Sequence, residues 1–262
     1  MKTDIHPAAV IEDGAVIGDG CKIGPFCYVG PNVKLGKNNL LHSNVVIDGN
    51  TEMGDGNEVY SFACLGKVSQ DLKFKAGMVA YTKIGDGNTF REYVTVNAAS
   101  EGATTTIGNN CLFLSYSHIA HDCILGNNII ISTDTKMAGH VEVGNHAIIN
   151  AKTGIVQFVR IGDFAFIGGL NKVAKDILPY CIADGIPSEI RAINKIGLER
   201  NGYDADAIKR IYSAYKAIIR SGKPLDEAAA ELQERFPDDE DVQKMITFAQ
   251  ESKLGLARPR AK

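Results

Sequence analysis

The sequence predicts a parallel β-solenoid followed by a small helical domain, and three observations support this prediction. A large apolar residue recurs at every sixth position in twenty-six hexads. Many of these residues are followed by Gly and then by Asp, Asn or Gly, which favour tight corners. Beyond the last hexad the apolar spacing changes to three and four residues, as in helices. The hexads occupy residues 5–65, 84–96 and 107–173.

Composition limits the class of protein. The chain has 262 residues, of which 45% are apolar, enough to build a core. Its net charge of -3 and pI near 6.1 argue against a general binder of nucleic acid or of membrane surfaces, which carries a basic excess. The N-terminus lacks the pattern of a signal peptide, and no stretch approaches the length of a membrane span. We therefore expect a cytoplasmic protein.

The short strands of such a solenoid are joined by a corner after every six residues, and each strand stacks on its counterpart one coil away at roughly 4.8 Å. Periodicity alone does not fix the handedness of the coil. Several of the six cysteines occupy the fifth hexad position, where a small buried residue is expected. Without a C-x-x-C pair, the cysteines are expected to be free thiols with no part in chemistry.

Two polar segments interrupt the hexads, at residues 67–83 and 97–106. Loops on a rigid scaffold often carry binding groups, so both are candidates for part of a site. The boundary between the solenoid and the helical domain is expected near residue 186, which gives domains over 1–186 and 187–262.

The helical domain shows the expected start and stop signals. Apolar residues recur at three and four between Ile208 and Ile219, with Asp204 or Asp206 as the N-cap and Gly222 as the stop. The segments "LDEAAAELQERFP" and "DDEDVQKMITFAQ" continue the helical pattern. Residues 189–223 carry eight Lys or Arg against four Asp or Glu, a charge balance that suits an acidic partner.

The stretch "IGDGCKIGPFCYVG" resembles the hexapeptide-repeat acyltransferases. The resemblance implies a left-handed parallel β-helix, a triangular prism in which three hexads, or eighteen residues, make one coil. With that coil length, positions 121, 139 and 157 stack along one edge of the prism.

That edge departs from the usual turn pattern. Ala120, Ala138 and Val156 stand where the next edge of the prism has Gly. Departures from a local rule tend to fall at functional sites. Polar residues from consecutive coils are expected to converge there, and they are His118, His121, Asp122, Gly139, His140 and Gln157.

Two chemistries compete for this cluster. General-base catalysis needs an imidazole, a carboxylate that fixes its tautomer, and a donor for a developing oxyanion, and His121, Asp122 and the main-chain N–H of Gly139 supply these parts. A zinc site would need three converging ligands, as in the γ-class carbonic anhydrases that use the same solenoid. The spacing of His118 and His121 does not match the wider His-x4-His spacing of those enzymes. We expect no metal, and a zinc enzyme remains the alternative.

The motifs "QDLK", "HIAHD", "AGHV", "VQF" and "GG", in this order, resemble the UDP-N-acetylglucosamine acyltransferases, which open lipid A biosynthesis. The resemblance covers essentially the whole chain. It implies transfer of a 3-hydroxyacyl group from acyl carrier protein to the 3-position of UDP-N-acetylglucosamine, without a cofactor, in a homotrimer with active sites between subunits. The related N-acyltransferase of lipopolysaccharide synthesis carries a uridine-binding domain ahead of its hexads, whereas the hexads here begin at Ile5.

The resemblance also implies a role for each site residue. The catalytic residues are His121 as general base, Asp122 as its orienting carboxylate, and Gly139 as oxyanion donor. The acceptor sugar and its phosphates are contacted by Gln70, Asp71, Lys73, His118, His140 and Gln157, of which Gln70 is the weakest candidate. The nucleotide is reached by Asn194 and Arg200, and the acyl chain lies in a groove near Gly169 and Phe166.

Two segments differ from the family pattern. Ile196 and Asn201 replace an acidic and a second basic residue in the nucleotide-binding stretch, which affects the affinity or pose of the nucleotide. The second loop begins Asn97-Ala98-Ala99-Ser100 where many relatives read His-Arg-Gly-Thr. This difference leaves open whether the acceptor presents a hydroxyl or an amine at its 3-position.

Overall fold

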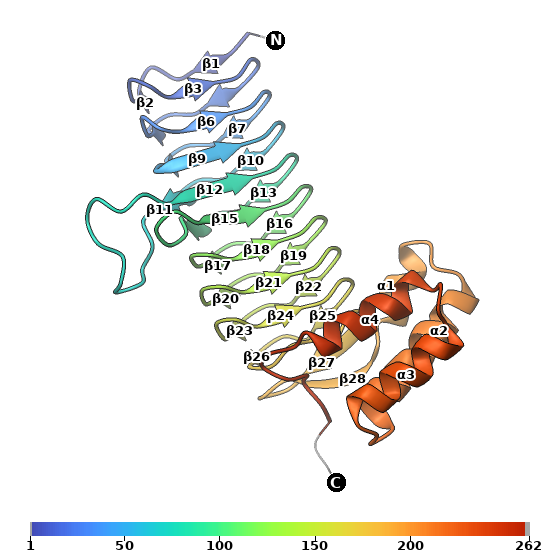
Figure 1. Ribbon diagram of the computed structural model, residues 1–262. Coiled ribbons are helices and arrows are strands. Elements are labelled where there is room, and N and C mark those ends of the chain that lie inside the picture. Colours follow the sequence, from blue (N-terminus) through green and yellow to red (C-terminus); the bar gives the residue numbers. More distant parts are fainter. Residues whose placement is uncertain (1, 260–262) are drawn as a thin grey trace.

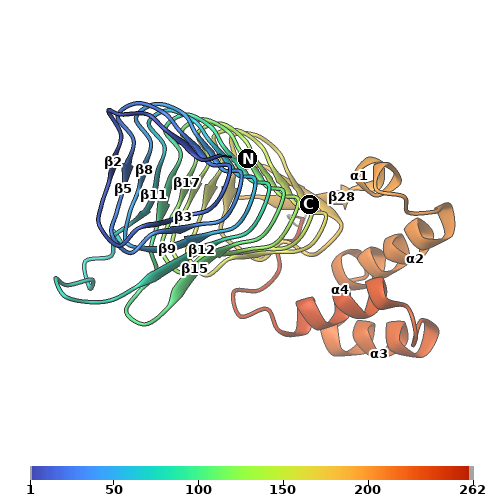
Figure 2. The same cartoon turned by 90° about the horizontal axis from the view of Figure 1, so that it is seen from above.

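The computed structural model describes residues 2–259 of the chain. The chain folds as a left-handed parallel β-helix, which confirms the predicted fold class. Figure 2 shows the triangular outline of the coils, and Figure 1 shows that the helices pack against the C-terminal end of the prism. The described residues include no helix long and apolar enough to cross a membrane.

Three sheets form the sides of the prism, and consecutive strands pass from one sheet to the next. Sheet A contains β1 (Asp4–Ile5), β4 (Lys22–Ile23), β7 (Leu40–Leu41), β10 (Glu58–Val59), β13 (Thr89–Phe90), β16 (Leu112–Phe113), β19 (Ile130–Ile131), β22 (Ile148–Ile149), β25 (Phe166–Ile167), β27 (Cys181–Asp184) and β28 (Glu189–Ile193). Sheet B contains β2 (Val10–Ile11), β5 (Tyr28–Val29), β8 (Val46–Ile47), β11 (Cys64–Lys67), β14 (Thr95–Asn97), β17 (His118–Ile119), β20 (Lys136–Met137), β23 (Gly154–Ile155) and β26 (Lys172–Val173). Sheet C contains β3 (Val16–Ile17), β6 (Lys34–Leu35), β9 (Asn50–Met53), β12 (Tyr81–Ile84), β15 (Thr104–Ile107), β18 (Ile124–Leu125), β21 (Glu142–Val143) and β24 (Arg160–Ile161).

The strand register gives the length of a coil. Ile119 pairs with Met137, and Met137 pairs with Ile155, so each coil of this part of the prism takes eighteen residues, as predicted. Each loop lengthens one coil: the first lies between β11 and β12 and the second between β14 and β15. The first loop projects away from the prism beside β11 and β12 (Figure 1).

The interior of the prism is filled by the aliphatic and aromatic residues of the hexads, which are almost completely buried from Ile23 onward. Phe90 and Phe113 stack inside at a centroid distance of 4.8 Å. All six cysteines are free thiols. Burial raises the pKa of the Cys123 thiol to about 12, so this cysteine is a packed apolar residue and no nucleophile.

The glycine that directly follows the apolar hexad residue serves close packing between coils, while the positive φ predicted for these corners falls on a later residue, such as Gly20 or Gly56. A Cβ atom on Gly126 would lie 2.7 Å from Oδ1 of Asn145, and one on Gly144 would lie 2.3 Å from Oδ1 of Asp163. Positive φ occurs two positions later, for example at Asn128 with φ of 57°. The Asn and Asp side chains accept hydrogen bonds from the backbone of the preceding coil, as Asn145 Oδ1 does from the Asn127 N–H at 2.8 Å.

The chain after the prism makes one more strand and then helices. β28 pairs antiparallel with β27, so sheet A extends beyond residue 186. The helices are α1 (Lys195–Arg200), α2 (Ala205–Tyr215), the π-helix η1 (Lys216–Arg220), α3 (Leu225–Arg235) and α4 (Glu240–Gln250). Asp204 caps α2 by accepting from the Ala207 N–H at 2.7 Å, in line with one of the two predicted caps. The spacing of apolar residues between Ile208 and Ile219 did not predict that η1 is a π-helix.

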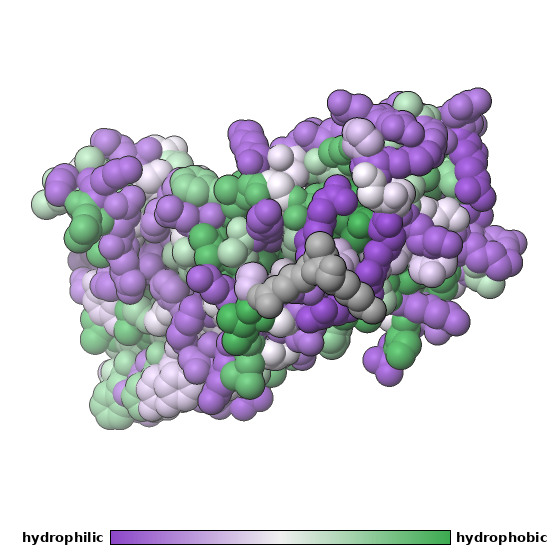
Figure 3. Space-filling model, turned by 90° about the horizontal axis from the view of Figure 1, so that it is seen from below, coloured by the Kyte–Doolittle hydropathy of each residue, from purple (hydrophilic) through white to green (hydrophobic). Residues whose placement is uncertain are grey.

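Polar contacts join the helices to the prism. The fully buried Tyr180 donates its hydroxyl to Asp241 of α4 at 2.7 Å, and Tyr203 donates to the same carboxylate oxygen at 3.3 Å. Lys244 of α4 pairs with Asp163 of the last coils at 2.7 Å. The face of the molecule seen in Figure 3 is mainly hydrophilic, with apolar residues distributed among the polar ones.

Candidate active site

The line of corners between sheets B and C carries most of the predicted site, and we call it the B–C edge. It consists of residues 120–123, 138–141 and 156–159 together with both loops, which leave and rejoin the prism at the same edge. The His140 N–H donates to His121 O at 3.0 Å, and the Phe158 N–H donates to Gly139 O at 3.2 Å. His121, Gly139 and Gln157 therefore stack in one column, as the eighteen-residue register predicts.

His121 and Asp122 form a hydrogen-bonded pair at this edge. Nδ1 of His121 lies 2.7 Å from Oδ2 of Asp122, and the two side chains are 15% and 8% exposed. The carboxylate is an acceptor, so the neutral form of the imidazole has its proton on Nδ1 and a free lone pair on Nε2. Burial raises the pKa of the Asp122 carboxyl, but hydrogen bonds from His121 and Ser100 outweigh it and hold the pKa below its ordinary value. The pair therefore has the arrangement of a general base with an orienting carboxylate.

Gly139 lies directly against the imidazole of His121. A Cβ atom on this glycine would lie 2.4 Å from Cε1 and 2.6 Å from Nε2 of the ring. Within residues 2–259 the Gly139 N–H has no hydrogen-bond acceptor. The absence of a side chain leaves room for a substrate carbonyl next to the N–H and the basic nitrogen.

Two further histidines flank the pair. His140 packs edge-on against His121, with ring centroids 5.2 Å apart, and stacks on Phe158 at 4.7 Å. His118 lies on β17, where its Nδ1 is 2.7 Å from Oγ1 of Thr95. Burial lowers the pKa of His118, and the charge of Lys136 adds to the effect, so this imidazole is neutral at physiological pH.

The two loops enclose a second part of the site. A cavity of about 240 Å³ between them is lined by Asp71 and Lys73 of the first loop and by Ser100 of the second. Asp71 accepts from the Lys73 N–H at 2.9 Å, which shapes the turn that carries both residues. Gln70 is exposed and does not line this cavity.

Ser100 is a functional candidate that the sequence did not single out. Its N–H lies 3.1 Å from both carboxylate oxygens of Asp122, and its hydroxyl donates to Oδ1 at 2.9 Å. The only signal in the sequence was its place in a loop that interrupts the hexads. A partner 22 positions away cannot be inferred from that signal, because the loop has no repeat to set its register.

The other predicted residues lie away from the B–C edge of the same chain. Asn194 caps α1 by accepting from the Gly197 N–H at 3.1 Å, and it donates to Phe164 O at 2.9 Å on the edge between sheets C and A. Arg200 is exposed in the last turn of α1. Gly169 follows β25, which carries Phe166, and lies on the edge between sheets A and B. One chain thus does not bring these residues together with His121.

The two residues that differ from the family pattern in the nucleotide-binding stretch lie in and just after α1. Asn201 ends α1 and donates from Nδ2 to Gly197 O at 2.8 Å, whereas Ile196 is 62% exposed. Neither side chain contacts the His121–Asp122 pair.

His121, Asp122 and His140 also form the one group of metal-ligand type among the described residues, with one ligand atom from each within 4.8 Å of the others. The same oxygen of Asp122, Oδ2, lies 2.7 Å from Nδ1 of His121 and 3.7 Å from Nε2 of His140. A hydrogen-bonded arrangement accounts for the first of these distances without an ion.

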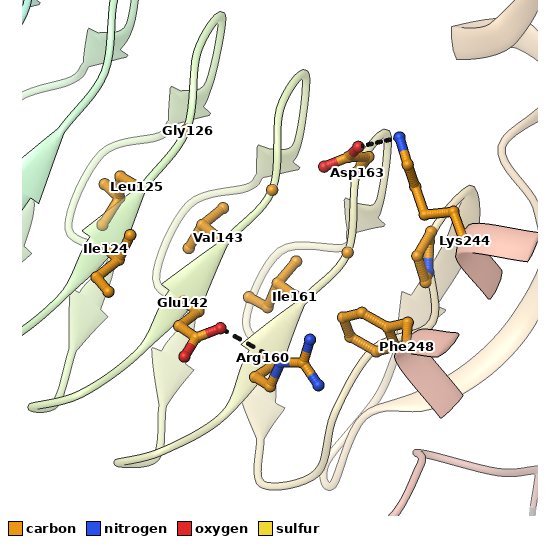
Figure 4. Close-up of a pocket in the computed structure, with 13 residues that line it drawn as sticks. Ile124, Leu125, Gly126, Glu142, Val143, Arg160, Ile161, Asp163, Lys244 and Phe248 are labelled. Atoms are coloured by element: carbon orange, nitrogen blue, oxygen red, sulfur yellow. Dashed lines mark hydrogen bonds and ion pairs between the residues drawn. The ribbon is translucent and has the colours of Figure 1, made fainter. Parts of the chain in front are cut away.

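Two hollows run along the outer face of sheet C. The larger, of about 780 Å³, begins at Asp122, His140 and Phe158 and continues towards Glu251 and Lys253. The smaller, of about 360 Å³, lies between sheet C and α4 (Figure 4). Its charged groups are paired within the chain, as Lys244 is with Asp163 and Arg160 with Glu142, so we regard it as part of the contact between the prism and α4.

Comparisons with known proteins agree on one family. Residues 176–257 match the family described as UDP N-acetylglucosamine O-acyltransferase, domain 2, and residues 104–139 match the bacterial transferase hexapeptide family. An acyl-[acyl-carrier-protein]–UDP-N-acetylglucosamine O-acyltransferase of Anaeromyxobacter sp. is 41% identical over 256 residues, which cover 97% of this chain and 99% of that protein. The enzyme of the same name from Psychromonas ingrahamii is 52% identical over 212 residues, or 80% of each chain.

Solved structures give the same result. The UDP-N-acetylglucosamine O-acyltransferase of Moraxella catarrhalis superposes with a TM-score of 0.94 at 39% identity, covering 97% of this chain and 99% of that one. The UDP-N-acetylglucosamine acyltransferase of Francisella novicida superposes with a TM-score of 0.95 at 34% identity, covering 97% and 94% of the two chains. These similarities do not favour the zinc-enzyme alternative.

Proposed function

Since the chain belongs to the acyl-[acyl-carrier-protein]–UDP-N-acetylglucosamine O-acyltransferase family, we propose that it transfers a 3-hydroxyacyl chain from acyl carrier protein to the 3-position of UDP-N-acetylglucosamine. This reaction is the first step of lipid A biosynthesis. The observation that carries the proposal is the hydrogen-bonded His121–Asp122 pair, together with the close approach of Gly139 to the imidazole of His121.

The geometry supports a direct transfer. Nε2 of His121 takes the proton from the acceptor 3-hydroxyl while the hydroxyl oxygen attacks the thioester carbonyl and forms the new C–O bond. The N–H of Gly139 donates to the oxyanion that develops on the carbonyl oxygen. Collapse of this intermediate breaks the C–S bond, and the imidazolium returns its proton to the departing thiolate. Asp122 keeps the imidazole in the required tautomer throughout and stabilises its charged form.

The remaining residues have proposed binding roles. Asp71, Lys73, His118, His140 and Gln157, with Gln70 beside them, contact the acceptor sugar and its phosphates. Asn194 and Arg200 contact the nucleotide, and Gly169 and Phe166 border the acyl chain. The last four lie away from the B–C edge of their own chain, and a homotrimer that places a neighbouring subunit against this edge brings such residues into one site. This separation supports the proposal of a homotrimer with shared active sites.

We also propose a cytoplasmic location. The six free thiols, mostly buried, suit a reducing compartment.

A direct assay tests the proposed function. Purified protein is incubated with UDP-N-acetylglucosamine and a series of 3-hydroxyacyl carrier proteins of different chain length, and the products are identified by mass spectrometry. A parallel reaction with the 3-amino analogue of the sugar nucleotide decides which acceptor is preferred. Formation of the O-acylated sugar nucleotide is expected, whereas absence of product with every donor and both acceptors contradicts the proposal.

Replacement of Gly169 by Met is expected to shorten the preferred acyl chain. A Cβ atom at Gly169 meets only Ala151 O, at 3.4 Å, so the backbone accepts a side chain and the variant folds. A bulky side chain in the groove displaces the terminal methylenes, each worth roughly 0.8 kcal/mol when buried. Loss of four of them costs about 3 kcal/mol, or roughly a hundredfold in selectivity against the longer donor. Competition between donors of different length, with the products weighed, measures the change. An unchanged length profile in an active variant means that the groove ends elsewhere.

A further inference from the structure

We propose that Ser100 is a positioning residue that directs the charge of Asp122 to His121 instead of His140. This inference rests on the proposed function, in which His121 is the general base. It assigns a role in the reaction to the second loop, where the chain differs from the usual pattern of its relatives.

The carboxylate of Asp122 has two neighbouring imidazoles but is oriented towards one. Oδ2 lies 2.7 Å from Nδ1 of His121 and 3.7 Å from Nε2 of His140. The two rings are perpendicular, with centroids 5.2 Å apart, so a modest rotation of the carboxylate would exchange one partner for the other. The hydrogen bond between Asp122 and His121 therefore persists only if another group holds the second carboxylate oxygen, Oδ1, in place.

Ser100 fixes that oxygen. Its hydroxyl donates to Oδ1 at 2.9 Å, and its N–H lies 3.1 Å from both oxygens. Burial raises the pKa of the Asp122 carboxyl, and the hydrogen bond from His121 together with these two donors lowers it below its ordinary value. Hydrogen bonds to an ionised group are stronger than those between neutral groups, so the contact can hold the carboxylate in one rotamer.

The second loop is anchored well enough to hold this position. The Ala98 N–H donates to Lys67 O at 2.7 Å, and the Gly102 N–H donates to Val79 O at 2.7 Å. These bonds tie the loop to the first loop on both sides of Ser100. On the other side of the contact, the Asp122 N–H donates to Oγ1 of the buried Thr105 at 2.9 Å. Both partners are therefore held by backbone hydrogen bonds.

The same serine borders the cavity between the loops, beside Asp71 and Lys73. An acceptor that binds there contacts the residue that holds Asp122. The position of the base is thus linked to the part of the site in which the acceptor is proposed to bind.

Three variants test the role of the hydroxyl. Ser100→Ala removes the hydroxyl but keeps the N–H, and Ser100→Thr keeps both donors. Ser115→Ala is the matched control, because Ser115 donates to the Glu92 carboxylate at the same distance of 2.9 Å on another edge of the prism. We expect Ser100→Ala to lower kcat by roughly tenfold to a hundredfold, the effect of one hydrogen bond to a charged group, with little change in the KM for acyl carrier protein. Ser100→Thr and Ser115→Ala should remain close to the unmodified protein.

The tautomer of His121 gives a readout that does not depend on turnover. ¹⁵N NMR of protein labelled at its histidine side chains, with the His121 signals assigned from the His121→Ala variant, shows which ring nitrogen carries the proton. In the unmodified protein Nδ1 should be protonated, whereas Ser100→Ala should show a mixture of both tautomers, which Ser100→Thr reverses. An unchanged tautomer in Ser100→Ala overturns the inference, even if kcat falls, because the serine would then act only on the loop. If the unmodified protein makes no product but the tautomer shifts as expected, the proposed function fails and the positioning role holds.

Discussion

Replacement of His121 by Ala should lower turnover by a factor on the order of 10²–10⁴, the usual effect of removing a general base. The imidazole is the group whose free Nε2 faces the space beside Gly139, and its other nitrogen is bound by Asp122. The side chain lies at a corner outside the hydrophobic core, so the variant should fold normally. Initial rates with saturating acyl carrier protein and UDP-N-acetylglucosamine, together with a thermal unfolding curve, measure both effects.

His42→Ala is a suitable control for this variant. His42 lies between β7 and β8, several coils towards the N-terminus, where it stacks on Tyr60 with ring centroids 4.4 Å apart, and it has no contact with the B–C edge. Its replacement should leave turnover unchanged. If His121→Ala keeps near-normal activity, the base must be another residue, and His140 and His118 are the next candidates because they flank the same space.

The fold and the central part of the site could be predicted because they depend on a repeat. The hexads repeat along the chain, and the resemblance to the hexapeptide-repeat acyltransferases implies three hexads per coil, so position 139 is expected above position 121 and position 157 above both. The register observed for Ile119, Met137 and Ile155 is the one predicted from the hexads together with the coil length of the family. A parallel stack of coils transmits a local pattern over the whole prism without any long-range information.

Parts of the site outside the repeat could not be predicted in the same way. The contact between Ser100 and Asp122 depends on how the second loop closes, and that closure is set by backbone bonds to Lys67 and Val79 in the first loop. The spacing of these residues in the sequence does not predict hydrogen bonds between the two loops. Asn194 shows the converse case: the resemblance to relatives gave its proposed role, but only the structure shows that its side chain already caps α1.

Local sequence rules also could not predict why glycine follows the apolar residue of many hexads. The pattern of Gly followed by Asn or Asp is typical of turns, and positive φ was the obvious explanation. In the structure the glycine at position 126 is required by the side chain of Asn145, which comes from the next coil. Contacts between coils, which the sequence does not show directly, determine the residue type at these positions.

Replacement of Gly139 by Ala is the smallest change expected to have a large effect on the reaction. The added methyl group would lie 2.4 Å from Cε1 and 2.6 Å from Nε2 of His121, well inside van der Waals contact. The backbone at Gly139 does not have positive φ, so the chain itself accepts an alanine and the conflict falls on the ring. The imidazole must move away from the bound thioester, and the methyl group fills the space next to the Gly139 N–H. A displacement of about 1 Å in a reacting group costs on the order of 10²-fold in rate, so a loss of at least that size in kcat is expected.

The matched control for this variant is Gly154→Ala. Gly154 lies on β23, has no positive φ, and has no atom within 4 Å of an added Cβ. Each variant adds one methyl group, at a corner next to sheet B for position 139 and on a strand of sheet B for position 154, but only the methyl group at position 139 meets the base. Steady-state kinetics of the two proteins should therefore differ by about 10²-fold in kcat, with similar unfolding temperatures. Equal kcat values for both would mean that the ring of His121 moves aside without affecting the reaction, and the oxyanion donor would then have to be sought at another N–H of the B–C edge.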